Sequence, residues 1–136
     1  MGMRLLIDTN IFLSILNEEE NYRSAKRLLE DIHKGKYVGF TSVICIAEIL
    51  SGFHSKGEVE RGERFLIDAK TINNFTIIDV DLSIAKEAAM IRAKYRARLP
   101  DAMIASTCAI HRALLITRDE TFKKIAEIEA KSPEEL

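Results

Sequence analysis

Four carboxylic acids, far apart in the sequence, are the side chains whose types and surroundings best suit chemistry. Asp8 ends an apolar run, and Asp119 closely follows another. Glu48 stands among apolar residues, and we expect it to be shielded from water, where a glutamate is rarely found without a partner. Asp101 directly follows Pro100, in the first turn of an expected helix. If the fold gathers these acids, their like charges raise one another's pKa or push the site apart.

A hard divalent cation relieves such repulsion best. Oxygen ligands suit Mg²⁺ or Mn²⁺, whereas zinc prefers histidine and cysteine. A magnesium ion held by carboxylates usually keeps several waters and contacts phosphate groups. The four acids together therefore predict phosphodiester or phosphoryl chemistry, in which a metal ion activates water and stabilises the leaving oxygen.

Each acid taken alone also has a simpler interpretation. Asp8 and Asp119 have the side chain and the position of helix N-caps. Asp101 has the charge that the first turn of a helix favours. Glu48 has no comparable structural role, and the combination of all four is more specific than any member.

The elements that must position these acids alternate between strands and helices. Short apolar runs, typical of strands buried on both faces, lie at 4–7, 37–41, 75–78 and 113–116, with an edge strand expected within 126–131. Helices are expected at 10–16 (capped by Thr9 or Asn10), 21–33, 43–50, 59–69, 82–95, 100–111 and 120–125. This alternation predicts a three-layer α/β/α domain with a parallel sheet, spanning residues 1–136. Ligands of such sheets bind at the carboxyl ends of the strands, where Asp8 and Asp119 lie.

Composition narrows the class of protein. The chain has 136 residues, of which 47% are hydrophobic, so it can bury a core and is not a disordered chain. Cys45 and Cys108 lack metal or redox spacing and read as packing residues, which favours a reducing cytosol. No apolar run approaches the roughly 20 residues that cross a bilayer, and the N-terminal run is too short for a signal peptide.

Four motifs occur here in the order and spacing of the PIN-domain family. They are an apolar strand ending in Asp8-Thr9-Asn10, a helix begun by Ser42 with Glu48 inside it, Pro100-Asp101-Ala102, and the run Leu-Ile-Thr-Arg-Asp at 115–119. The chain length and the stretch Ala-Glu-Ile-Leu-Ser-Gly at 47–52 resemble VapC-type toxins of prokaryotic toxin–antitoxin pairs. The resemblance runs from about Arg4 to Lys124.

This resemblance implies a PIN fold with strand order 3-2-1-4-5 and a metal-dependent endoribonuclease whose products carry 5′-phosphate and 3′-hydroxyl ends. The acids of the family fall on Asp8, Glu48, Asp101 and Asp119, which would hold Mg²⁺ or Mn²⁺; its supporting polar residues fall on Thr9, Asn10 and Thr117. Such toxins usually form homodimers. They are inhibited by an antitoxin whose C-terminal segment enters the acidic groove, often with an arginine.

Positive charge that could bind RNA is concentrated in one segment. Residues 86–124 contain nine Lys and Arg against four Asp and Glu, a local balance of +5. Arg92, Lys94, Arg96 and Arg98 lie just before Asp101, where they suit contact with backbone phosphates. The same residues equally suit a solvated helix face, or pairing with acids of a neighbouring chain.

Two other classes of protein compete with the nuclease. A phosphoacceptor receiver domain needs a pair of acids after the first strand, but Thr9 and Asn10 follow Asp8. A non-catalytic module that keeps the fold and acts with an antitoxin on DNA has no need of four clustered carboxylates. Binding of Mn²⁺ distinguishes the nuclease from this module.

Overall fold

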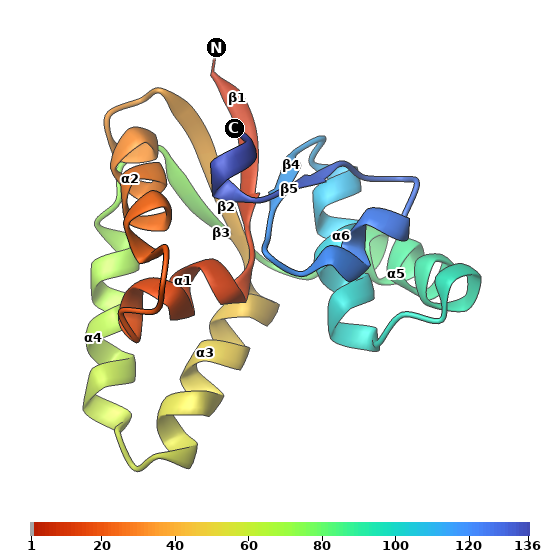
Figure 1. Cartoon of the computed structure of the whole chain (residues 1–136). Coiled ribbons are helices and arrows are strands. Elements are labelled where there is room, and N and C mark those ends of the chain that lie inside the picture. Colours follow the sequence, from red (N-terminus) through yellow and green to blue (C-terminus); the bar gives the residue numbers. More distant parts are fainter. Residues whose placement is uncertain (1) are drawn as a thin grey trace.

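Five parallel strands form the central sheet of the computed structural model, which describes residues 2–136. The strands are β1 (Met3–Ile7), β2 (Tyr37–Ser42), β3 (Phe75–Ile78), β4 (Leu114–Ile116) and β5 (Ala130–Lys131). Their order across the sheet is β3-β2-β1-β4-β5 (Figure 1). The predicted α/β class, parallel sheet and strand order are confirmed. Met1, the first residue of the expected domain 1–136, lies outside the described residues.

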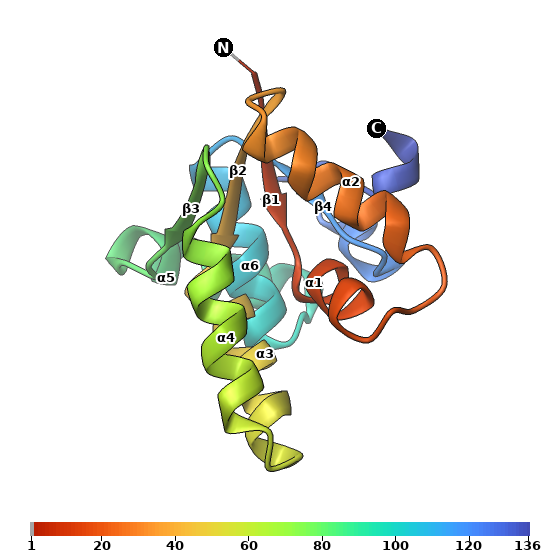
Figure 2. The ribbon, with the colours of Figure 1, turned by 90° about the vertical axis from the view of Figure 1, so that its left-hand side faces the viewer.

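Helices cover both faces of this sheet. The helices are α1 (Thr9–Leu16), α2 (Tyr22–His33), α3 (Val43–Ser55), α4 (Val59–Lys70), α5 (Leu82–Tyr95) and α6 (Leu99–Ile110), with short 3₁₀ helices η1 (Glu120–Lys124) and η2 (Pro133–Glu135). Helices α1, α2 and α4 lie on one side, and α5 and α6 on the other (Figures 1 and 2). The pair α3 and α4 extends past the carboxyl ends of the strands. Within residues 2–136, no helix has the length and apolar character needed to cross a bilayer.

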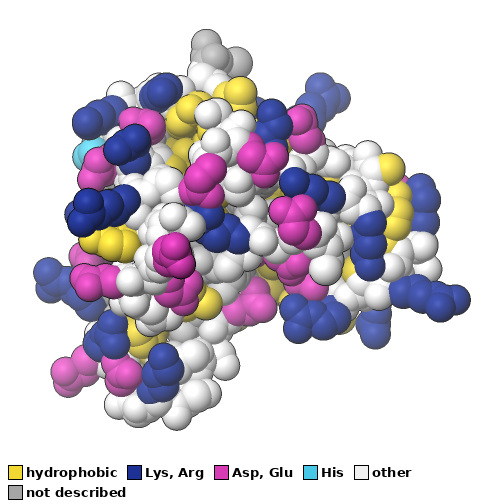
Figure 3. Space-filling model, viewed as in Figure 1, with side chains coloured by type: hydrophobic (Ala, Val, Ile, Leu, Met, Phe, Trp, Pro, Cys, Tyr) yellow, Lys and Arg dark blue, Asp and Glu magenta, His cyan; other side chains and the backbone are white. Residues whose placement is uncertain are grey.

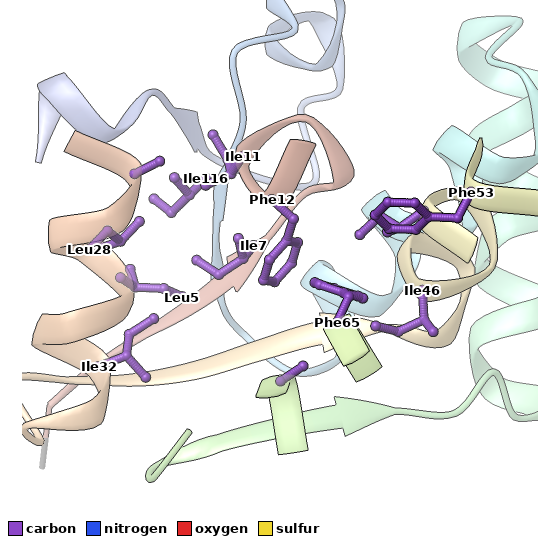
Figure 4. Packing of buried hydrophobic residues seen from close by; sticks show 13 residues of the cluster. Leu5, Ile7, Ile11, Phe12, Leu28, Ile32, Ile46, Phe53, Phe65 and Ile116 are labelled. Atoms are coloured by element: carbon purple, nitrogen blue, oxygen red, sulfur yellow. The ribbon is translucent and has the colours of Figure 1, made fainter. Parts of the chain in front are cut away.

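The central strand β1 separates two hydrophobic clusters. Leu5 and Ile7 point into the cluster beneath α1, α2 and α4, whereas Leu6 points into the cluster beneath α5 and α6. In the first cluster the Phe12 ring meets the edge of Phe65 at 5.6 Å between centroids (Figure 4). Because Leu5, Leu6 and Ile7 are fully buried, the second half of the strand is a continuous apolar run.

Helix α2 approaches β2 closely at Gly39. A Cβ atom built there would lie 2.8 Å from two side-chain carbons of Ile32 and 2.9 Å from the Phe75 ring. The position therefore requires glycine, since neighbouring side chains occupy the space.

The structure refines the sequence predictions for three of the helices. The helix expected at 43–50 continues to Ser55, since Gly52 alone does not end a helix whose inner face stays apolar. Of the residues considered as caps of α1, Asp8 is the N-cap, and Thr9 and Asn10 lie inside the helix. The helix expected at 120–125 is a short 3₁₀ helix over residues 120–124.

Candidate active site

Asp8 lies at the carboxyl end of β1 and is only 5% exposed. Its Oδ1 accepts a hydrogen bond from the backbone N–H of Thr9 at 2.8 Å. Its Oδ2 accepts from the hydroxyl of Thr117 at 2.7 Å and from Nδ2 of Asn10 at 3.0 Å. The three supporting residues indicated by the family resemblance thus all hold this carboxylate, which also caps α1.

The pKa of Asp8 is raised to about 6. Burial is the largest cause, because it removes the charged form from water. The negative charges of Glu48 and Asp101 raise the pKa further, whereas the hydrogen bonds from Thr117 and Thr9 lower it. Acids on α3 and α6 therefore act electrostatically on the acid that follows β1.

Glu48 reaches the site from α3. The expectation that it is shielded from water is wrong: Cys45, Ile46 and Ile49 take the buried positions of the helix, which leaves Glu48 exposed. The hydroxyl of Thr9 donates to Oε1 of Glu48 at 2.8 Å. This bond ties the Glu48 carboxylate to the residue that follows Asp8.

Asp101 lies in the first turn of α6 and is paired with Arg98. The guanidinium donates from Nε at 3.1 Å and from Nη2 at 3.4 Å to the two carboxylate oxygens. The pKa of Arg98 is raised, mainly by this hydrogen bonding, and the negative charges of Glu48 and Asp119 also contribute. Arg98 thus supplies positive charge to the acids, a role that the sequence reasoning missed. The i,i+3 spacing of Arg98 and Asp101 was the available signal.

Asp119 is the acid most engaged in structure. Its Oδ1 accepts from the backbone N–H of Thr121 at 2.9 Å and from the Thr121 hydroxyl at 2.7 Å, which caps η1. Its own N–H donates to the hydroxyl of Thr117 at 3.0 Å. Asp119 is therefore connected to Asp8 through Thr117 and to the other acids through the charge of Arg98.

The donors around Asp8 suit a hard cation in type. Among residues 2–136, no three carboxylate, imidazole or thiol side chains are already gathered closely enough to enclose a metal ion. The charged groups that act on Asp8 are carboxylates. Cys45 Sγ lies 4.0 Å from Asp8 Oδ1, but burial raises the pKa of this thiol to about 11, so it stays protonated. Oxygen donors without a thiolate fit Mg²⁺ or Mn²⁺ better than zinc.

The four basic residues before Asp101 do not form one uniform patch. Lys94 donates to Glu127 at 3.1 Å, and Arg98 pairs with Asp101. Arg92 and Arg96 are exposed and form no ion pair within the described part of the chain. In Figure 3, acidic side chains lie beside the notch between the α3–α4 pair and the α5–α6 pair. Basic side chains lie along the lower edge of the part formed by α5 and α6.

Comparisons with known proteins agree with this architecture. The sequence model of the PIN domain matches residues 5–128. A toxin–antitoxin complex from Klebsiella pneumoniae contains a chain with 28% identity and a TM-score of 0.70, covering 95% of this chain and 97% of that one. The VapBC2 structure from Rickettsia felis, bound to a promoter DNA fragment, has 22% identity and a TM-score of 0.79, covering 96% and 98%. VapBC-1 from Haemophilus influenzae has 18% identity and a TM-score of 0.77, covering 97% and 99%. No curated protein sequence matches the chain.

Proposed function

Because the chain belongs to the PIN-domain family, we propose that it is a metal-dependent endoribonuclease and the toxin of a toxin–antitoxin pair. One observation carries the proposal. Asp8, Glu48 and Asp101, from three separate elements, lie close enough at the carboxyl edge of the sheet for two of them to raise the pKa of the third. A nuclease needs such a group of acids, whereas a module that only binds a partner gains nothing from their repulsion.

Asp8, Glu48 and Asp101 would hold the Mg²⁺ or Mn²⁺ ion, and Asp119 would complete the site. A divalent cation supplies a Lewis acid that activates water and offsets the negative charge that develops on the phosphate. The remaining positions keep the acids in place. Thr117 and Asn10 hold Asp8, and the Thr9 hydroxyl holds Glu48.

Arg98 has two roles in the proposed function. Its pairing with Asp101 offsets part of the acidic charge when no cation is bound. Once a cation balances Asp101, the guanidinium is free to contact a phosphate of RNA, for which its forked donors are well suited. Arg98 is 75% exposed, so this change requires no rearrangement of the core.

The partners of the protein belong to the same proposal. The Klebsiella structure, at 28% identity, is described as a toxin–antitoxin complex, which supports an antitoxin as the binding partner here. We also propose a homodimer that acts in the cytoplasm, where the two free, buried cysteines stay reduced.

Cleavage of RNA by the purified protein tests the activity. We expect cleavage with Mg²⁺ or Mn²⁺, no cleavage with a chelator, and 5′-phosphate ends on the products. Asp8→Asn and Asp101→Asn should abolish cleavage without unfolding the protein. Asp68→Asn is the matched control, because Asp68 is exposed on α4 and its one ion pair within residues 2–136 is with Arg64.

Two results would overturn the assignment. Full metal-dependent cleavage by Asp8→Asn would remove Asp8 from the site. Absence of cleavage by the wild-type protein, combined with no binding of Mn²⁺, would favour a non-catalytic module that acts with its antitoxin on DNA.

A further inference from the structure

A small basic cavity adjoins the acids on the side of η1. It has a volume of about 190 Å³ and is lined by the α5–α6 connection and by η1. Arg96, Arg98 and Lys124 contribute three positive charges, Thr121 a hydroxyl group, and Asp101 the single carboxylate. The cavity therefore has a net positive charge although it borders the acidic site.

Two of its cations form no ion pair with an acid of the described residues. Arg98 is paired with Asp101, but Arg96 and Lys124 form no ion pair within residues 2–136. The neighbouring Lys123, which does not line the cavity, contacts Glu120 at 3.2 Å and Glu135 at 3.5 Å. Arg96 and Lys124 are thus available to bind an anion in the cavity, whereas the charge of Lys123 is already balanced by Glu120 and Glu135.

The walls of the cavity are fixed by the fold. Tyr95, at the end of α5, donates its hydroxyl to Glu127 at 2.6 Å and accepts from the backbone N–H of Ala126 at 3.1 Å. These bonds fasten the end of α5 to the segment that follows η1. On the other side, η1 is anchored by Phe122 and Ile125, each 2% exposed. The backbone segments that carry Arg96 and Lys124 are therefore held in place by packing and hydrogen bonds.

The size of the cavity limits its ligand. Sites for drug-sized molecules usually exceed about 300 Å³, so this cavity suits a smaller group. A single phosphate group on a longer chain fits the size, and guanidinium and ammonium groups, which Arg96 and Lys124 supply here, are usual donors to it.

We propose that this cavity binds one backbone phosphate of the RNA, next to the phosphate that is cleaved. The proposal rests on the proposed nuclease function, because its substrate is the RNA that the acids act on. Arg98 and Asp101 belong to both places, and Thr121, which lines the cavity, donates its hydroxyl to Asp119. A phosphate held by Arg96 and Lys124 therefore fixes the strand beside the acids without contacting the reacting bond.

The double variant Arg96→Gln with Lys124→Gln tests this subsite. The matched control is Arg23→Gln with Lys26→Gln on α2, which removes the same charge from a distant helix. In cleavage assays we expect the KM of the cavity variant to rise tenfold to a hundredfold, with kcat within about twofold of wild type. In binding assays with labelled single-stranded RNA and a chelator, the slope of log K against log salt should become shallower by about 0.7, the share of one phosphate.

The outcomes separate the subsite from the nuclease proposal. If the cavity variant has the KM and the salt slope of the control, there is no subsite. A loss of kcat at unchanged KM overturns it as well, because binding is then not what the two residues provide. If the wild-type protein cleaves no RNA, the nuclease proposal fails, and the binding assay alone still decides on the subsite. Titration with Mn²⁺, expected to be equal for wild type and variant, confirms that the acids are intact.

Discussion

In the metal-free protein, the buried negative charge of Asp8 should lower the free energy of unfolding at neutral pH. Its pKa is raised from 3.8 to about 6, so the folded state binds the proton more tightly than the unfolded state does. Stability from this group is therefore greatest at low pH and is lost as the pH rises through 6. A pKa difference of this size corresponds to about 3 kcal/mol in the free energy of unfolding. Solvent screens the charge of Asp8 little, because this residue is only 5% exposed.

The substitution Asp8→Asn removes this penalty. The amide still accepts one set of hydrogen bonds, but its NH₂ group cannot accept from Asn10 and Thr117, which costs about 1 kcal/mol for each of the two bonds. Without metal, we expect the variant to be more stable than wild type by about 1 kcal/mol near pH 8. Near pH 5 the wild-type carboxyl is largely protonated, and the stability difference should disappear.

Urea unfolding at the two pH values, with a chelator present, measures this difference. Asp81→Asn is the control: Asp81 also caps a helix, accepting from the N–H of Ile84 at 2.9 Å, but is exposed, so its replacement should change stability by less than about 0.5 kcal/mol. A variant that is no more stable than wild type near pH 8 would refute the reasoning. So would a stability difference that does not change with pH.

Two further predictions concern packing and thiol reactivity. Gly39→Ala should destabilise the protein by about 1–3 kcal/mol, because the new Cβ would meet Ile32. Gly52→Ala should stabilise α3 by about 0.5–1 kcal/mol, because no atom lies within 4 Å of the new Cβ. Thermal unfolding measures both variants, and equal effects on stability would contradict the close approach of α2 to β2 at Gly39. Burial raises the pKa of Cys45 to about 11 and of Cys108 to about 12, so neither should react with a thiol reagent near pH 8 until the protein unfolds. Rapid labelling of the folded protein would show that a thiol is accessible.

The sheet could be predicted from the sequence because its strands are buried on both faces. Leu5, Leu6 and Ile7 are all fully buried, so β1 appears as an apolar run that ends at a polar residue. Such runs alternate with amphipathic helices, and this is the pattern of a parallel sheet. The strand order needed more, because it came from the resemblance to the PIN family and not from the alternation.

The electrostatic arrangement of the site could be predicted only in part. The acids at strand ends follow from topology, but the exposure of Glu48 depends on the rotational phase of α3, which a helix that is apolar almost all round does not reveal. The sequence already indicated Asp119 as a helix N-cap, whereas the pairing of Arg98 with Asp101 depends on side-chain conformations. A list of residue types therefore indicated candidate acids, but not that Arg98 pairs with one of them.

The central claim is that Asp8, Glu48 and Asp101 together bind one divalent cation. Calorimetric titration with Mn²⁺ tests it most directly, on wild type, Asp8→Asn, Glu48→Gln, Asp101→Asn and the control Asp68→Asn. We predict binding to wild type and control, and a loss of at least tenfold in affinity for each of the three site variants. Wild-type affinity in Asp8→Asn or Asp101→Asn, or no binding to the wild-type protein, would contradict the account.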